Sequence, residues 1–202
     1  MTIRVLLADD ENLILGALSA LLALEDDIEV VAEADNGTKA VDLAGRCNPD
    51  VCVLDLNMPG KDGITVTRDL QRAMPGTRCM LITSHAAPGY LKQALKAGAR
   101  GFVPKTTSAQ QLAVIIRDIH LGAQYVDPDM AADALSAGES PLTGREVDIL
   151  TLAADGAPIG EIAQRAALRP GTVRNYLSDI MGKLGVANRH EAVHAARRLG
   201  WI

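Results

Sequence analysis

Five short apolar runs that alternate with helical patterns constrain the fold of this 202-residue chain more than any other feature. The runs are rich in Val, Ile and Leu, and they cover residues 3–8, 28–34, 51–55, 79–83 and 101–105. Strands that are apolar on both faces and separated by helices are typical of a parallel sheet covered by helices on each side. The sequence therefore predicts a doubly wound α/β domain with a five-stranded parallel sheet.

The helical patterns divide the chain into three segments. We place the α/β domain at residues 1–121. Its helical patterns cover residues 12–24, 37–46, 63–74, 89–97 and 108–121. Residues 122–140 are acidic and rich in small side chains, which is typical of a linker, with room for one short helix. Residues 141–202 show only helical patterns, among them two helices joined by a tight turn, the second of them longer. These proportions predict a small all-α helix-turn-helix domain.

Charge is distributed unevenly along the chain, whose net charge is -5. Residues 141–202 hold 8 basic and 6 acidic side chains, so only this segment carries a positive net charge. A nucleic acid partner would bind there. Because so few charges are available for phosphate contacts, a single copy would bind weakly, and we expect a dimer on a two-fold symmetric site. Aromatic residues make up only 2% of the chain, which argues against single-strand binding by base stacking.

The remaining composition favours a cytoplasmic protein with no membrane insertion. The three cysteines, Cys47, Cys52 and Cys79, form no CxxC motif, so we expect free thiols in a reducing compartment. The sequence shows no signal-like leader and no apolar stretch of about 18 residues.

Charged and polar side chains follow the predicted strands at the ends where ligands bind in open α/β sheets. Asp9 and Asp10 follow the first strand, Asp55 and Thr83 end the third and fourth, and Lys105 ends the fifth. Three carboxylates at one edge repel one another unless a cation neutralises them, and oxygen ligands suit Mg²⁺. A phosphoryl group on the Asp55 carboxylate would meet the cation, the lysine and the threonine hydroxyl. Each acid alone could be a helix cap or a surface charge, but the set predicts a nucleophilic aspartate.

These residues lie in stretches that resemble a known family. The stretches "LLADDENLIL", "VLDLNMPGKDG", "LITS" and "KAGARGFVPKT" are similar to the flavodoxin-like receiver domain of bacterial response regulators. The stretch "LTGREVDIL" and the region "EIAQRAALRPGTVRNYLSDIMGKLGVANRHEAV" resemble the LuxR-type DNA-binding domain of the NarL/FixJ subfamily. Within the subfamily, "PGYLKQALKAG" and the recognition-helix region look most like the DesR-type regulators.

The resemblance implies a phosphoryl transfer from a sensor histidine kinase to Asp55. Mg²⁺ would be held by Asp10, Asp55 and the backbone carbonyl of Asn57, with Asp9 acting through a water molecule. Thr83 and Lys105 would bind the phosphoryl oxygens.

Five positions with other roles are compared with the same family. Phe102 would be the aromatic switch residue that turns inward when the threonine moves, and Ser84 is small enough to leave access to the acyl phosphate. Asn57 and His85 would set the lifetime of the phosphoryl group. For His85, an ordinary exposed loop histidine with no such role is an equal alternative. Pro104 departs from the usual aliphatic residue. Since proline lacks a ladder donor, it predicts that the fifth strand is the sheet edge.

The helix that begins near Pro170 carries the predicted DNA contacts. Arg174 and Asn175 can each form two hydrogen bonds with a base edge, and with Ser178 they lie on or beside one helix face near its start. A solvated helix face would look similar, and the resemblance decides between the two. The predicted phosphate contacts are Arg169, Thr172, Lys183 and Arg189. We expect Ile162, Ala163, Val173 and Leu177 to be core residues.

The first helix is apolar around more of its circumference than packing on a sheet requires. Leu13, Ala17, Ala20 and Leu21 could form an exposed patch, or they could pack against other parts of the chain. We expect phosphorylation to favour a homodimer of receivers, through helices one and five or through the face of helix four and strand five.

Two other functions fit the sequence less well. The first is an enzyme. A phosphatase or mutase with an aspartate nucleophile needs a second acid two residues later, where this chain has Asn57. A nucleotide-binding enzyme is disfavoured because the first strand is not followed by a glycine-rich loop. We therefore expect no enzyme activity beyond the receiver's own phosphoryl transfer and dephosphorylation. The second alternative is a DNA-binding regulator with a receiver fold that works without phosphorylation.

Overall fold

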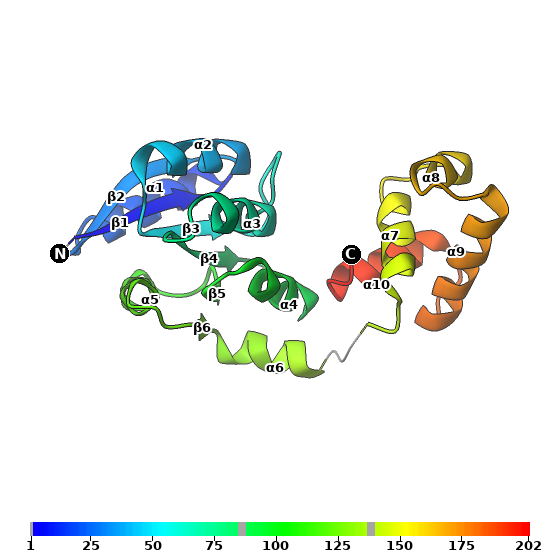
Figure 1. Cartoon of the computed structure of the whole chain (residues 1–202). Helices are drawn as coiled ribbons and strands as arrows, with labels where there is room; N and C mark the ends of the chain where they lie inside the picture. The colour runs from blue at the N-terminus through cyan, green and yellow to red at the C-terminus, as the bar shows by residue number, and fades with distance from the viewer. Residues whose placement is uncertain (1, 85–87, 137–139) are drawn as a thin grey trace. The chain divides into compact units, whose positions relative to one another are not determined.

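The computed structural model describes residues 2–84, 88–136 and 140–202. The chain forms two compact units that divide near Asp133, one α/β and the other all-α (Figure 1). We call them the receiver unit and the helical domain, and describe each by itself.

The receiver unit is built on a parallel sheet with the strand order β2-β1-β3-β4-β5-β6. The strands are β1 (Ile3–Ala8), β2 (Ile28–Ala34), β3 (Val51–Asp55), β4 (Arg78–Thr83), β5 (Gly101–Pro104) and β6 (Tyr125–Val126). The first five follow the predicted runs closely, and the predicted doubly wound fold is confirmed. The sheet has six strands instead of five because β6, inside the predicted linker segment, pairs with β5.

The prediction that the fifth strand is the sheet edge is therefore wrong. That prediction is based on the missing N–H of Pro104. In the structure, the Pro104 nitrogen lies where no described strand needs it as a donor. The carbonyl of Phe102 accepts a hydrogen bond from the N–H of Asp127 on the β6 side. Alternate residues of a strand direct their N–H groups to the same side, so the Pro104 nitrogen faces that side just beyond the two-residue strand. On the other side, the N–H of Lys105 donates to the Thr83 carbonyl at 2.8 Å.

Five helices cover the two faces of the sheet. They are α1 (Asn12–Leu22), α2 (Gly37–Cys47), α3 (Gly63–Ala73), α4 (Pro88–Ala97) and α5 (Ala109–His120). Alternate strand residues such as Val5, Val53 and Ile82 form one core cluster with α1 and α5. Their neighbours in sequence face the other way, as the two-residue period of a strand requires.

The segment after α5 is partly regular. Helix α6 (Pro128–Ser136) begins after Asp127, whose side chain accepts hydrogen bonds from the N–H groups of Asp129 and Met130. The predicted linker thus contains β6 and one short helix. Leu135, near the end of α6, is 84% exposed.

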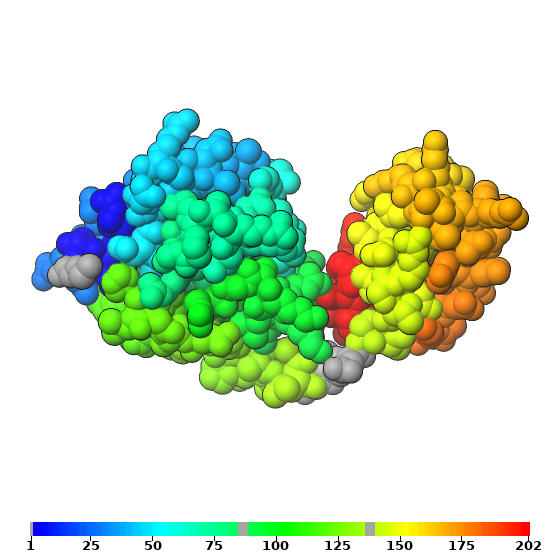
Figure 2. Space-filling model, viewed as in Figure 1, coloured from blue at the N-terminus to red at the C-terminus, as the bar shows by residue number. Residues whose placement is uncertain are grey.

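The helical domain contains four helices around one core. They are α7 (Gly144–Ala153), α8 (Ile159–Arg165), α9 (Pro170–Leu184) and α10 (Arg189–Arg198). The predicted core residues Ile162, Ala163, Val173 and Leu177 are all buried there. Helix α9 lies at the surface of this domain, where Figure 2 shows it in orange. Among the described residues, none of the helices is both long and apolar enough to cross a bilayer.

Candidate functional site

The predicted site residues meet at the carboxyl end of the sheet. Asp9 directly follows β1, Asp55 and Thr83 are the last residues of β3 and β4, and Lys105 directly follows β5. Strand β3 pairs with β1 on one side and with β4 on the other, all parallel, so these strand ends lie side by side. The parallel register alone thus brings together residues up to 96 positions apart in the sequence.

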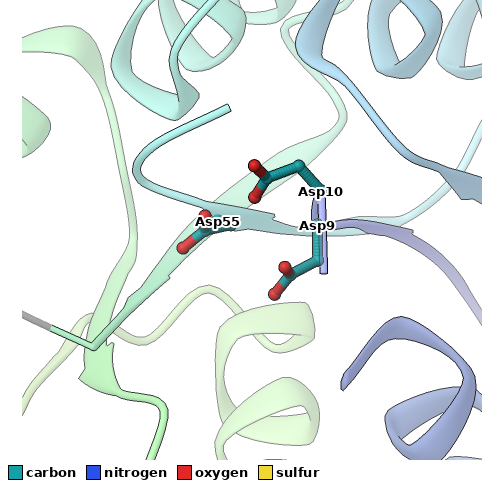
Figure 3. A group of neighbouring side chains, drawn as sticks. All are labelled: Asp9, Asp10 and Asp55. Carbon is teal, nitrogen blue, oxygen red and sulfur yellow. The ribbon is translucent and has the colours of Figure 1, made fainter. Parts of the chain in front are cut away.

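Three carboxylates form the acidic part of the site. Asp9, Asp10 and Asp55 each offer one oxygen, and these oxygens lie within 4.8 Å of one another (Figure 3). Asp9 and Asp55 are buried, with exposures of 1% and 4%, whereas Asp10 is exposed. The group is therefore open to solvent on the Asp10 side.

Lys105 forms the basic part of the site. Its Nζ lies 2.8 Å from Asp9 Oδ2, 2.9 Å from Glu11 Oε1 and 3.3 Å from Asp55 Oδ1, and its side chain is only 9% exposed. Burial alone would lower the pKa of Lys105. The contacts with Asp9 and Glu11 and the charge of Asp55 outweigh burial and raise its pKa above the ordinary value. The lysine is a permanent cation in this site.

The negative charge of the site exceeds what the lysine can neutralise. Burial raises the pKa of Asp55 to about 6; the Lys105 charge opposes this shift, and the neighbouring Asp9 carboxylate adds to it. Asp9 Oδ2 is buried and, within the described part of the chain, accepts no well-oriented hydrogen bond despite its contact with Lys105. An oxygen-only donor set with an unsatisfied buried oxygen and excess negative charge fits a hard divalent cation such as Mg²⁺.

A close approach of two backbone segments fixes the loop after β3. A Cβ atom on Gly63, the first residue of α3, would lie 2.3 Å from the backbone oxygen of Asp55, so any larger residue would displace the acid. The N–H of Gly63 also donates to the carbonyl of Leu56, and the side chain of Asp62 caps α3. The sequence "DG" at the helix start therefore holds Asp55 in place.

The other predicted receiver residues have different environments. Thr83 is fully buried at the end of β4, and the ring of Phe102 on β5 is also fully buried. Asn57 is exposed in the loop after β3, and Ser84 is exposed after β4. His85 lies outside the described residues. The roles of these residues in switching and in phosphoryl lifetime stay predictions.

Helices α8 and α9 form the helix-turn-helix. The turn contains Ala167 in the left-handed region, with φ 53°, and the N–H of Leu168 donates to the Ala163 carbonyl at 2.8 Å. Such a geometry ends a helix sharply and usually takes glycine. Helix α9 then starts with Pro170 in its first turn, and its N-cap residue, Arg169, makes no side-chain capping hydrogen bond.

The predicted DNA contacts fall into two groups in the structure. Arg169, Arg174, Asn175 and Ser178 are exposed on or just before α9, and Thr172 is half-buried. The charged groups of Lys183 and Arg189 instead have partners within the domain. Lys183 Nζ lies 2.7 Å from Glu146 Oε2, and Arg189 donates to the carbonyls of Ala157 and Gly156. Phosphate contacts by these two residues stay predictions and would compete with those partners.

Sequence analysis did not identify Glu146, whose side chain is almost fully buried at 4% exposure. Its carboxylate accepts hydrogen bonds from the N–H and hydroxyl of Thr143 at 2.7 and 2.8 Å, as well as the contact from Lys183. The spacing of Thr143 and Glu146 is a capping-box signature that could have been read from the sequence. The contact with Lys183 has no such local signal. Glu11, the third partner of Lys105, was missed for the same reason.

The first helix presents the exposed apolar patch that its sequence suggested. Leu13 is 86% exposed and Leu21 46% exposed, and Ala17 and Ala20 are also exposed. These residues share one face of α1, so packing within the receiver unit does not account for them.

Comparisons with known proteins agree with both halves of the molecule. Residues 5–117 match the family model "Response regulator receiver domain", and residues 140–196 match "Bacterial regulatory proteins, luxR family". The transcriptional regulatory protein DesR of Bacillus subtilis is 41% identical over 99% of both chains, which confirms the expected likeness to DesR-type regulators. The transcriptional regulatory protein UhpA of Escherichia coli is 36% identical over 98% of this chain and all of that one.

Among solved structures, a receiver domain of the putative response regulator NarL from Mycobacterium tuberculosis is 35% identical. The match covers 60% of this chain and 98% of the solved chain, with a TM-score of 0.58. Similarity across both domains to transcriptional regulators excludes the alternative of an aspartate-nucleophile phosphatase or mutase. The chain belongs to the response regulators of the NarL/FixJ family, which join a receiver domain to a LuxR-type DNA-binding domain.

Proposed function

We propose that this protein is a cytoplasmic response regulator that is phosphorylated on Asp55 by a sensor histidine kinase and then binds promoter DNA as a dimer. The observation that carries the proposal is the juxtaposition of Asp55 with Asp9, Asp10 and Lys105 at one edge of the sheet. This arrangement supplies a nucleophile, an acidic cation site and a permanent cation for the incoming phosphoryl oxygens.

The chemistry is a phosphoryl transfer between two residues. An Asp55 carboxylate oxygen attacks the phosphorus of a phosphohistidine, a P–O bond forms, and the P–N bond breaks. The leaving imidazole nitrogen keeps the bonding electrons and takes up a proton. Mg²⁺, when bound, neutralises charge on the carboxylates and on the transferred group. Asp10, Asp55 and the backbone carbonyl of Asn57 would hold it, with Asp9 acting through water. Lys105 and the hydroxyl of Thr83 would bind the phosphoryl oxygens.

The same site would return the protein to its resting state. Water attacks the acyl phosphate and releases inorganic phosphate, which regenerates the Asp55 carboxylate. Asn57 and Ser84 are both exposed beside the site and leave an approach to it. Under this proposal the receiver catalyses only its own phosphoryl transfer and dephosphorylation.

Binding of duplex DNA is assigned to the exposed start of α9. Arg174 and Asn175 would bond base edges in the major groove, with Ser178 beside them. Arg169 and Thr172 would contact phosphates, which position the domain without reading sequence. Because few charges are available, two copies on a two-fold symmetric site would bind far more tightly than one.

The exposed patch on α1 is a candidate for the dimer contact. Leu13 and Leu21 are exposed there, and Val114 on α5 is 51% exposed, so α1 and α5 could together form a self-complementary surface. Phosphorylation would favour this dimer by repositioning Thr83 and Phe102. The face of α4 and β5 is the other predicted surface.

The first test is intact mass after incubation with Mg²⁺ and acetyl phosphate. We expect the wild type to gain one phosphoryl group and Asp55→Asn to gain none. Asp35→Asn is the matched control, because Asp35 also directly follows a strand, β2, but is exposed and pairs with Lys39. Lack of phosphorylation by this donor and by phosphoramidate would favour a regulator that works without phosphate.

The second test measures mass in solution by light scattering, with and without the phosphoryl group. We expect phosphorylation to convert monomers into dimers, and Leu13→Glu to prevent this conversion. Leu135→Glu is matched in exposure, at 84% against 86%, and should dimerise as the wild type does. If both variants dimerise normally, the patch on α1 is not the contact surface.

A further inference from the structure

The contact between Glu11 and Lys105 lies at the predicted phosphorylation site but has no part in the function proposed above. Glu11 Oε1 is 2.9 Å from Lys105 Nζ, and the Glu11 side chain is 57% exposed. Three carboxylates contact Lys105. Glu11 is exposed, whereas Asp9 and Asp55 are buried. The contact with Glu11 is a hydrogen bond, whereas Asp9 Oδ2 accepts no well-oriented hydrogen bond from the ammonium group within the described part of the chain.

The backbone of Glu11 is fixed, so its side chain reaches the lysine from a defined position. Its N–H donates to Asp9 Oδ1 at 2.9 Å, and its carbonyl accepts from the N–H of Leu15 at 3.0 Å. Glu11 occupies the N-cap position of α1, yet its side chain makes no capping hydrogen bond. The carboxylate is directed to Lys105 instead of to the free N–H groups of its own helix.

A phosphoryl group on Asp55 would need at least one donor of Lys105. Three carboxylate oxygens lie within 3.3 Å of the Lys105 Nζ, so the phosphoryl group has to compete with them for the ammonium group. Releasing Asp9 would leave its buried Oδ2 without a cationic contact, which is costly. Glu11 is more than half exposed, so water can replace the lysine at low cost. Glu11 is therefore the partner that gives way.

We propose that Glu11 is a positioning residue that holds Lys105 in the unphosphorylated receiver and competes with the phosphoryl group for it. This proposal rests on the function proposed for Asp55. Glu11 opposes the phosphorylation of Asp55, because phosphorylation must break the contact between Glu11 and Lys105 and dephosphorylation restores it. A receiver without the contact is phosphorylated more readily and holds its phosphoryl group longer.

The test uses the full-length protein with Mg²⁺ and beryllofluoride, a stable mimic of the phosphoryl group, followed by NMR of backbone amides near Thr83. For Glu11→Gln we expect the beryllofluoride concentration at half-saturation to fall by a factor of about two to five. This factor corresponds to the loss of one exposed ion pair. The half-life of the acetyl-phosphate-labelled protein should rise by a similar factor.

A second variant separates the contact from a general effect of charge. Glu11→Asp keeps the negative charge but is one methylene shorter, so it no longer reaches Lys105 from the fixed backbone. If the contact matters, Glu11→Asp shifts in the same direction as Glu11→Gln. If Glu11→Asp behaves as the wild type while Glu11→Gln shifts, only the overall charge acts, and the proposal is overturned.

The matched control is Glu29→Gln. Glu29 has a side-chain exposure of 58% and one ion pair, with Arg4, at the start of β2, away from the carboxyl end of the sheet. It should leave both readouts unchanged. A wild type that binds beryllofluoride normally, with Glu11→Gln identical to it, overturns this proposal alone. A wild type that binds none overturns the function proposed for Asp55 and this inference with it.

Discussion

The receiver unit and the helical domain each bury a cluster of charged side chains, but the charge balance of the two clusters differs. In the receiver, one lysine contacts three carboxylates, and burial and Asp9 raise the pKa of Asp55 to about 6 although Lys105 opposes them. In the helical domain, one carboxylate, Glu146, contacts one lysine and one threonine. Its hydrogen bond with Lys183 lowers its pKa although burial opposes this, and the Thr143 contacts add to the lowering.

The difference separates a chemical role from a structural one. A buried charge whose partners balance it holds a fold together, whereas a buried cluster with excess charge is stable only with something it binds. The Glu146 cluster joins the start of α7 to the end of α9 and leaves no charge to spare. The Asp55 cluster leaves an oxygen of Asp9 without a well-oriented hydrogen bond, as a site for a cation and a phosphoryl group would.

The largest expected effect is the loss of the balanced cluster. We expect Glu146→Ala to lower the free energy of unfolding of the helical domain by about 2–3 kcal/mol, because it removes a capping box and a buried charged hydrogen bond. Trp201 is the only tryptophan, and it packs on the core of this domain, so its fluorescence reports this transition during urea unfolding.

The matched control for that change is Glu191→Ala. Glu191 also lies in the first turn of a helix and accepts hydrogen bonds from Ala187 and Asn188, but it is exposed. We expect a cost below about 1 kcal/mol there. Equal costs at the two positions would show that burial and the lysine add nothing to Glu146, which would break the comparison.

The same kind of change in the other cluster should have the opposite sign. We expect Asp55→Asn to raise the free energy of unfolding of the receiver unit by about 1–2 kcal/mol at pH 8 without Mg²⁺, because it removes one of the excess carboxylates. Urea unfolding followed by circular dichroism measures the receiver transition, with Trp201 fluorescence as the internal reference. A destabilised variant would mean that Asp55 is balanced by Lys105 after all.

The pH dependence of that difference sharpens the comparison. Since the pKa of Asp55 is raised to about 6, the folded receiver takes up a proton between pH 6 and about 4 that the unfolded chain does not. The wild type should therefore gain stability relative to Asp55→Asn as the pH falls through 6, by about 1 kcal/mol. The lowered pKa of Glu146 works the other way. Its contribution is complete above the ordinary glutamate pKa and is lost only at lower pH.

Measuring the two transitions at pH 5 and pH 8 in EDTA tests this. The advantage of Asp55→Asn over the wild type should be large at pH 8 and small at pH 5. The free energy difference between Glu146→Ala and the wild type should be the same at both. A constant advantage of the asparagine variant would contradict the assigned charge state of Asp55.

Much of the receiver could be predicted because its signals are local. The five apolar runs place the strands, and their parallel pairing then brings Asp9, Asp55 and Lys105 to one edge without any further information. The two-residue strand β6 could not be found this way, because "YV" is too short to show a period. It forms because Tyr125 and Asp127 donate hydrogen bonds to the carbonyls of Arg100, just before β5, and of Phe102 on β5, which is a tertiary effect.

The charged contacts were predictable only in part. The sequence identifies which groups lie at the strand ends, but it does not indicate that Glu11 bends toward Lys105, 94 residues away. Likewise, Lys183 looks like a free phosphate contact near the end of a recognition helix. Its partner, Glu146, is 37 residues earlier and two helices away. Long, flexible side chains choose their partners in three dimensions, which a pattern along the chain does not encode.

The smallest expected effect lies at the start of α9, where Arg169 occupies the N-cap position and makes no capping hydrogen bond. A positive charge at a helix start is unfavourable, and serine is among the best N-cap residues. Arg169→Ser should therefore stabilise the helical domain by about 0.5–1 kcal/mol in Trp201 fluorescence unfolding. It should also weaken DNA binding, because a phosphate contact is lost. The slope of log affinity against log salt concentration should fall by about 1.

The two readouts of Arg169→Ser together decide what the arginine is for. Binding is measured by anisotropy on a duplex selected from a random library with the phosphorylated protein. Arg174→Ala is the comparison variant, since loss of a base contact should relax sequence preference at one position. A more stable Arg169→Ser variant with an unchanged salt slope would mean that the arginine has no phosphate contact. A lower salt slope together with higher stability would show that the charge of Arg169 destabilises the domain but contributes to DNA binding. The helical domain would then contain one balanced charged cluster, that of Glu146, and one unfavourable charge that serves DNA binding.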